Sequence, residues 1–212
     1  MCFSAGASFG ASAVLLGAGV VTLSQTRTRS EWAFAGIPLL FAVQQFSEGL
    51  LWWALTDPAY ASWKELSTYV FFFFAQVFWP VWIPLSVWLL EKKALREKVL
   101  RIFLVAGVLL AIYLIISIAQ FGVMAFIEKY HIRYGPKYPF GVVRTILYIL
   151  IVLGPFFISS VKKMRVFGAC ASVALVVTLV FFKGFLVSIW CFFAAIISLL
   201  IWWILWQNKK ST

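Results

Sequence analysis

Seven long apolar runs, separated by short polar gaps, make up nearly all of this chain. An apolar helix of about 20 residues, rising about 1.5 Å per residue, crosses the hydrocarbon core of a bilayer. The runs are Ser8–Ser24, Trp32–Leu55, Leu66–Leu90, Ile102–Phe126, Phe140–Ser160, Val166–Phe182 and Leu186–Trp206. The pattern predicts an all-α bundle of seven transmembrane helices. It also predicts one integral membrane domain over residues 1–212, because few residues remain for a soluble domain.

Composition and charge support this interpretation. Charged residues are 12% of the chain, about half the usual share in a soluble domain. The net charge of +11 does not indicate a nucleic-acid partner, because the basic residues gather in alternate short gaps. These are Arg27, Arg29, Lys92, Lys93, Arg96, Lys98, Arg101, Lys162, Lys163, Arg165, Lys209 and Lys210. The positive-inside rule places these gaps in the cytoplasm, with the N-terminus outside and the C-terminus inside. The expected partner there is the lipid bilayer, and the oligomeric state stays open.

One acidic residue, Glu48, lies within the second apolar run. A carboxylate in hydrocarbon needs a partner, a proton or a water-filled pocket. Gln44 and Gln45 precede Glu48 by four and three residues, so the three side chains share one helical face. The group is therefore a candidate site for a ligand or proton. The alternative is a structural clamp that holds neighbouring helices together.

Three more polar residues on other runs could lie near Glu48. Gln76 lies near the middle of the third run, where it could meet Gln44 or Gln45. Pro80 and Pro84 follow it and predict a kink in that helix. Arg144 and Lys183 lie at the outer ends of the fifth and sixth runs, so either cation could face the carboxylate of Glu48.

The thiols and the single histidine form a second candidate group. Cys2, Cys191 and His131 all belong to the outer half, and Cys170 lies near the inner end of the sixth run as an apolar filler. Three alternatives remain open for Cys2 and Cys191: a disulfide, unpaired thiols, or a copper or zinc site with His131. No Cys-x-x-Cys or His-x-x-x-His spacing supports a metal, so no cofactor is predicted.

Two further segments carry packing expectations. Gly6 and Gly10, and Ala13 and Gly17, have the small-x-x-x-small spacing that allows close helix contact. This spacing predicts that the first helix lies inside the bundle. The outer gap 127–139 is rich in Tyr, Gly and Pro, and its composition predicts a structured loop.

Several stretches resemble a bacterial membrane-protein family of unknown function. They are Met1–Phe9 (MCFSAGASF), Pro38–Gly49 (PLLFAVQQFSEG), Phe78–Glu91 (FWPVWIPLSVWLLE) and Ser188–Ala195 (SIWCFFAA). The resemblance implies a multi-pass protein of the bacterial inner membrane. It also implies that Cys2, Glu48 and Cys191 belong to the pattern of the family. It brings no activity with it.

These observations favour a binding or transport function. We expect an outward-facing polar pocket that binds or passes a small solute, cation or proton, centred on Glu48. Gln44, Gln45 and Gln76 would line its deeper wall. One alternative is a membrane enzyme acting on a lipid or quinone-like substrate, using Glu48 as acid or base or a cysteine as nucleophile. The other is a scaffold. No Gly-x-Ser-x-Gly, Walker or His-Glu-x-x-His motif occurs.

Overall fold

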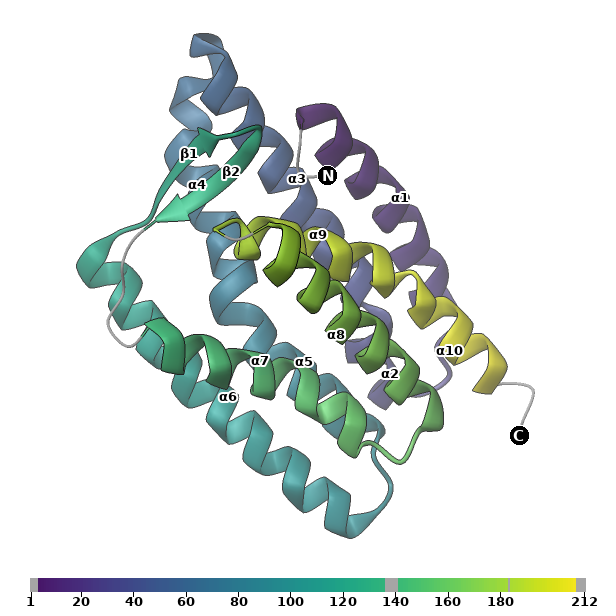
Figure 1. The fold of residues 1–212 in the computed structure, drawn as a ribbon. Helices are drawn as coiled ribbons and strands as arrows, with labels where there is room; N and C mark the ends of the chain where they lie inside the picture. The colour runs from purple at the N-terminus through teal and green to yellow at the C-terminus, as the bar shows by residue number, and fades with distance from the viewer. Residues whose placement is uncertain (1–3, 136–140, 183, 209–212) are drawn as a thin grey trace.

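A helical bundle with one β-hairpin at its end forms the fold (Figure 1). The computed structural model describes residues 4–135, 141–182 and 184–208. Within them, seven helical segments are long and apolar enough to cross a membrane, as the sequence predicts. These segments are Ala5–Ser24, Arg29–Thr56, Pro58–Leu90, Ala94–Phe121, Gly141–Ile158, Lys162–Phe181 and Leu186–Leu205. The orientation of the two termini stays a prediction.

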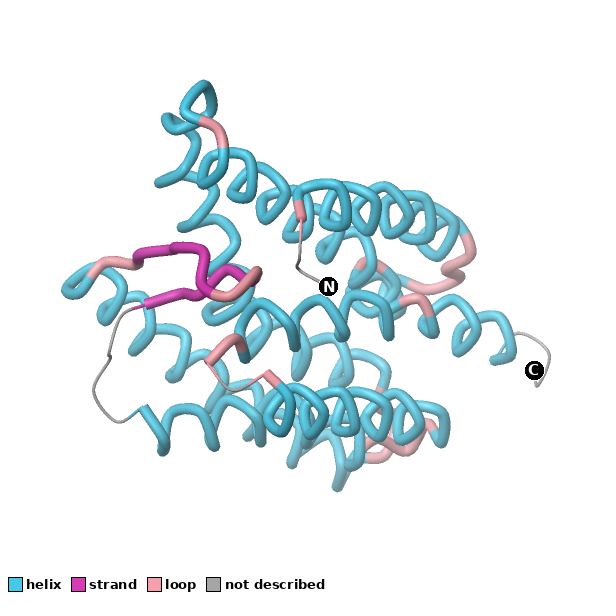
Figure 2. Tube along the Cα trace, turned by 45° about the horizontal axis from the view of Figure 1, so that its top comes forward, coloured by secondary structure: helices cyan, strands magenta, loops and turns pink. Residues whose placement is uncertain are grey.

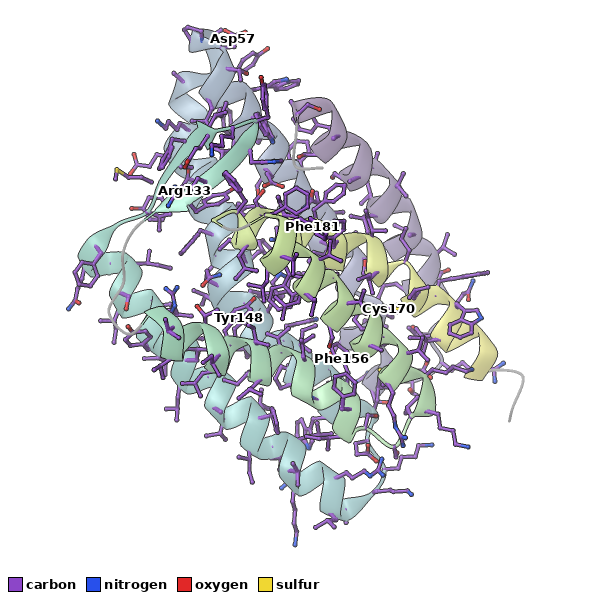
Figure 3. All side chains as sticks on the ribbon, in the orientation of Figure 1. Asp57, Arg133, Tyr148, Phe156, Cys170 and Phe181 are labelled. Atoms are coloured by element: carbon purple, nitrogen blue, oxygen red, sulfur yellow. The ribbon has the colours of Figure 1, made fainter. Side chains whose placement is uncertain are left out.

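The bundle has two distinct ends. We call the end that carries the hairpin and Asp57 the hairpin end (Figure 3). We call the opposite end the basic end, because its turns at residues 25–28, 91–93 and 159–161 are flanked by the clustered Lys and Arg residues. The positive-inside rule predicts that the basic end faces the cytoplasm.

Three of the seven spans are interrupted helices. The second divides into α2 (Arg29–Ala35) and α3 (Ile37–Thr56), and the last into α9 (Leu186–Ser198) and α10 (Leu200–Asn208). The third begins with a 3₁₀ turn, η1 (Pro58–Trp63), and continues as α4 (Lys64–Phe72), a π-helical segment η2 (Phe73–Phe78) and α5 (Trp79–Leu90). The remaining long helices, α1 (Ala5–Ser24), α6 (Ala94–Phe121), α7 (Gly141–Ile158) and α8 (Lys162–Phe181), are continuous.

The π-helical segment lies where the prolines predict a distortion. Pro80 cannot donate a backbone hydrogen bond to the preceding turn, and η2 ends two residues before it. The hydroxyl of Tyr148 on α7 donates to the carbonyl of Ala75 within η2, at 2.6 Å. Such a contact satisfies backbone that the regular helix no longer pairs, as is common where π-turns persist.

The fourth run differs from its predicted boundaries. Helix α6 begins at Ala94 and ends at Phe121, because Gly122 adopts a φ of 65° and stops the helix. The last residues of the predicted run instead form β1 (Met124–Glu128), which pairs antiparallel with β2 (His131–Gly135). The predicted structured loop is therefore a β-hairpin over its described part, at one end of the bundle (Figure 2). Residues 136–139 lie outside the described residues.

Helix α1 lies at the edge of the bundle (Figure 1), so its predicted interior position was wrong. Its buried face consists of Ser8, Ser12, Leu15, Gly19 and Thr22. That face packs on α3, where the Ser12 hydroxyl donates to the Ala42 carbonyl at 2.8 Å. The residues with small-x-x-x-small spacing, Gly6, Gly10, Ala13 and Gly17, are exposed. The close packing of α1 on α3 therefore depends on Ser12 and Gly19 rather than on those four residues.

One carboxylate joins two turns at the basic end. Glu91 follows α5 and accepts hydrogen bonds from the Ser160 hydroxyl at 2.6 Å and the Ser160 amide at 2.7 Å. It also accepts from the amides of Lys92 and Lys93, at 3.0 and 2.9 Å. Burial alone would raise the pKa of Glu91, but these hydrogen bonds outweigh it and lower the pKa. The turn after α5 is thereby fixed to the turn after α7.

This contact predicts an acid-sensitive stability. A carboxyl group whose pKa is lowered by folding stabilises the protein above its ordinary value of 4.5, and the contribution is lost as the pH falls through the lowered pKa. We expect Glu91→Gln to lower the free energy of unfolding by about 1–3 kcal/mol at neutral pH. Thermal unfolding in detergent across pH should show that the difference in stability between wild type and Glu91→Gln disappears in acid. The control is Glu97→Gln, which changes a carboxylate in an exposed ion pair. An equal loss of stability in Glu97→Gln and Glu91→Gln at neutral pH would contradict this account.

Helix packing gives a second prediction. A Cβ atom on Gly107 of α6 would lie 1.9 Å from the carbonyl oxygen of Pro80, whereas one on Gly17 of α1 would meet no atom within 4 Å. We expect Gly107→Ala to lower the free energy of unfolding by about 1–3 kcal/mol. The matched control Gly17→Ala should be neutral or stabilising, because alanine favours helix. Equal melting temperatures for the two variants would contradict the α5–α6 contact.

Candidate functional site

The candidate site is a polar group buried between α1, α3 and α9. Gln44, Gln45 and Glu48 on α3 each have an exposed fraction of 0%. Ser8 on α1 and Ser188 on α9 are also 0% exposed. We call these five residues the polar core. Their helices meet because α3 packs on both α1 and α9.

A short hydrogen bond joins α9 to the carboxylate. The hydroxyl of Ser188 donates to Oε1 of Glu48 at 2.6 Å. Cys191 lies one turn further along α9, beside the side chain of Gln44 and within electrostatic range of Glu48. Sequence reasoning missed Ser188, although its spacing of three residues from Cys191 places both on one face of a helix.

The side chain of Gln44 is oriented by a tryptophan. Nε1 of Trp79 donates to Oε1 of Gln44 at 2.7 Å, and the Trp79 ring stacks on Phe41 with centroids 4.1 Å apart. The predicted meeting of Gln76 with Gln44 or Gln45 was wrong. The amide of Gln76 instead contacts the carbonyl of Ala75 at 3.4 Å, because the π-helical segment turns this side chain towards α7.

Several buried polar atoms of this region have no hydrogen-bond partner among the described residues. They are Ser8 Oγ, Gln44 Nε2, Gln45 Oε1, Gln45 Nε2 and Trp52 Nε1. Each such group costs about 1–3 kcal/mol when it is removed from water and left unpaired. Native proteins satisfy almost all buried polar groups, by protein atoms, ordered water or ligands. These buried polar atoms therefore mark the region as a candidate binding site.

Apolar side chains close the polar core towards both ends of the bundle. At the hairpin end, Leu51 and Trp52 pack with Ala125 and Ile132 of the two strands. Tyr134 of β2 adds a ring stacked on Phe71 of α4, with centroids 4.9 Å apart. Towards the basic end, the Phe41–Trp79 stack follows directly. The hairpin therefore closes the candidate site at the hairpin end, and Glu48 has no solvent-exposed surface in this structure.

Gln76 and Arg144 belong to a different place. They line a cavity of about 60 Å³ between η2, α7 and α9, together with Thr145 and Tyr148. Whether Arg144 faces the carboxylate of Glu48 stays a prediction. Cys191 lies on the cavity wall, so it separates this space from the polar core.

The predicted thiol and histidine group does not assemble into a metal site among the described residues. His131 packs on the rings of Phe182 and Phe185, with centroids 5.7 and 4.8 Å away. No three His, Cys, Asp or Glu side chains within residues 4–135, 141–182 and 184–208 gather to hold a metal ion. Cys191 and Cys170 are free thiols, so Cys191 does not form the disulfide that was one of the predicted alternatives. Cys2 and Lys183 lie outside the described residues.

The burial of Cys191 gives a third prediction. Its exposed fraction is 6%, so in a Cys2→Ser, Cys170→Ser double variant the single remaining thiol should resist a water-soluble maleimide. Unfolding in denaturant should make it react fully. The complementary variant that keeps only Cys170, which is partly exposed, serves as the control. Rapid labelling of Cys191 in the folded protein would contradict a closed polar core.

Comparisons with known proteins support the family resemblance. No curated protein and no solved structure matches the chain. One family model, described as a family of unknown function (DUF6629), matches residues 1–212. The match covers the whole sequence, including the segments that form α1, α3, α5 and α9. The chain therefore belongs to the DUF6629 family, whose function is unknown.

Proposed function

We propose that this protein is a multi-pass membrane protein that binds a small cation or a proton in the polar core around Glu48. The observation that carries the proposal is the incomplete hydrogen bonding of two fully buried residues, Gln45, three residues before Glu48 on α3, and Ser8 on the adjacent helix α1. The proposed setting is a bacterial inner membrane, with the hairpin end outside. The seven apolar helices support the membrane setting, and the basic turns support this orientation. The bacterial origin is what the family resemblance implies.

A structural clamp explains only part of the polar core. The Ser188–Glu48 and Trp79–Gln44 hydrogen bonds hold α3 to its neighbours, as a clamp would. Gln45 makes no such bond within the described residues, although its whole amide is buried. If this side chain served only for packing, burying a leucine there would cost less free energy than burying an unpaired amide. The second glutamine therefore favours a bound species.

The chemistry of the available atoms favours a cation. The polar core offers oxygen atoms from the Glu48 carboxylate, the Gln45 amide and the Ser8 and Ser188 hydroxyls. Oxygen ligands suit hard cations, and the carboxylate supplies the negative charge. Ser8 reaches this level because Ser12, one turn along α1, bonds Ala42 of α3. The alternative is a proton bound to Glu48, which would neutralise the carboxylate in the same way.

Entry to the core requires a movement at the hairpin end. At the hairpin end, the polar core is closed by a small apolar cluster of Leu51, Trp52, Ala125 and Ile132. The opposite closure is the continuous hydrophobic core that includes Phe41 and Trp79. Displacing a two-stranded hairpin disturbs less packing than opening this core. We therefore assign access to the outer side, with passage through the protein needing a further rearrangement.

The test is a cation-dependent unfolding measurement. Purified protein is melted in detergent with sodium or potassium against N-methyl-D-glucamine at constant ionic strength. A ligand at about 100 times its Kd stabilises the folded state by about 2.7 kcal/mol. We expect the wild type to gain stability with a small cation and with acid, and Glu48→Gln to gain neither. Ser188 can still donate to the amide oxygen of that variant, so it should fold.

Matched variants separate binding from folding. Glu65→Gln changes an exposed carboxylate at the hairpin end and should keep the wild-type response. Ser8→Ala should weaken the cation response while acid sensitivity remains. If the wild type responds to neither cation nor pH, while Glu48→Gln only lowers stability, the polar core is a clamp and the proposal is overturned.

A further inference from the structure

Two basic turns are fixed to each other at the basic end. The turn after α5 contains Lys92 and Lys93, and the turn after α7 leads into Lys162, the first residue of α8. The carboxylate of Glu91 accepts hydrogen bonds from the hydroxyl and the amide of Ser160, at 2.6 and 2.7 Å. The two turns therefore lie side by side (Figure 1), although the bonded residues are 69 positions apart in sequence.

Five cations on these two segments form a surface of one charge. We call them the basic patch: Lys92, Lys93, Arg96, Lys162 and Arg165. Among the described residues, no ion pair includes any of them. Nη1 of Arg96 is buried and has no hydrogen-bond partner in the described part of the chain. Buried donors in native proteins almost always find an acceptor, so the basic patch offers a donor that an anion would satisfy.

Helix α8 adds to the positive charge of the basic patch. The N-terminal end of a helix carries a partial positive charge, which acidic side chains or bound anions offset. The N-cap residue of α8, Val161, provides no side-chain hydrogen bond, and the first turn contains no acidic residue. Lys162 and Arg165 occupy the first four residues instead. An anion bound here would be stabilised by the helix as well as by the cations.

Exposed apolar side chains lie next to these cations in the sequence of both helices. Leu95, in the first turn of α6, has an exposed fraction of 77%, and Val166 on α8 has one of 47%. Nζ of Lys163 lies over the ring of Trp203, 5.7 Å from its centroid, and tryptophan is enriched where membrane meets water. A soluble anion gains nothing from an exposed leucine. A lipid presents phosphate and hydrocarbon together, so it matches this surface better.

We propose that the basic patch binds an anionic lipid whose headgroup carries two phosphate groups, one held by each basic turn. Each lysine or arginine at a membrane surface strengthens the binding of anionic lipid by about fivefold. A guanidinium engages two phosphate oxygens at once, as Arg96 and Arg165 would. Two phosphates on one short linker match two turns that Glu91 holds together. The inference is independent of cation binding at Glu48.

The test measures lipid binding by native mass spectrometry of the full-length protein in detergent. Cardiolipin, which has two phosphates, is compared with phosphatidylglycerol at equal phosphate concentration. We expect the wild type to bind cardiolipin at least about tenfold more tightly, because its second phosphate binds intramolecularly. Lys92→Gln and Lys162→Gln should each weaken cardiolipin binding by about fivefold. The matched control Arg27→Gln changes an exposed cation in the turn after α1 and should bind like the wild type.

Two further variants distinguish a fixed site from general attraction. Ser160→Ala removes the hydroxyl that donates to Glu91 and changes no charge. Glu91→Gln removes a negative charge, which by itself would strengthen the binding of every anionic lipid. If the contact between the turns positions the cations, both variants should instead lower the preference for cardiolipin over phosphatidylglycerol.

Three results would overturn the proposal. The first is equal affinity of the wild type for cardiolipin and phosphatidylglycerol. The second is an equal loss of cardiolipin binding in Arg27→Gln and Lys162→Gln. The third is displacement of cardiolipin by an equal concentration of inorganic pyrophosphate, which would identify a soluble anion as the ligand. Lys92→Gln and Lys162→Gln change exposed side chains, so the test stays valid if Glu91→Gln does not fold.

Discussion

The hydrogen bond from Ser188 to Glu48 is the interaction on which the centre of this bundle depends. It joins the second and seventh spans, 140 residues apart in sequence, through a carboxylate without solvent exposure. Desolvating a charged group is costly, and only well-placed donors compensate. On the neighbouring helices, α9 supplies the donor, α1 approaches α3 closely where Gly19 meets Leu39, and Trp79 of α5 fixes Gln44, one turn from Glu48.

Departures from regular helix determine which polar residues meet. The π-helical segment η2 carries Gln76 to α7, where Tyr148 bonds the Ala75 carbonyl. The strands after α6 bring Ile132 against α3 and Tyr134 against α4 at the hairpin end. As a result, the residues that were expected to line one pocket fall into two groups. The polar core contains Glu48, whereas Gln76 and Arg144 line the cavity between η2, α7 and α9. Cys191 lies on the cavity wall and also beside Gln44 of the polar core.

The sequence predicts the spans well, because about 20 apolar residues in a row have few alternatives to a membrane helix. It also predicts that Gln44, Gln45 and Glu48 share a face, because helical spacing fixes this locally. It fails where the outcome depends on non-local packing. The π-helical segment η2 turns Gln76 away from Gln44 and Gln45. Residues 124–126 belong to strand β1 after Gly122 ends the helix. The glycines of α1 with small-x-x-x-small spacing are exposed. Ser188 has no distinctive signal until α9 is placed against α3.

The central claim is that Glu48 belongs to a ligand site rather than to a packing clamp. Infrared difference spectroscopy tests it most directly, because it observes the carboxyl group itself when sodium replaces N-methyl-D-glucamine. The account predicts carboxyl bands that change with the cation in the wild type and in Glu65→Gln, and that are absent in Glu48→Gln. Identical difference spectra for the wild type and Glu48→Gln would contradict it, and would leave the buried carboxylate with a structural role alone.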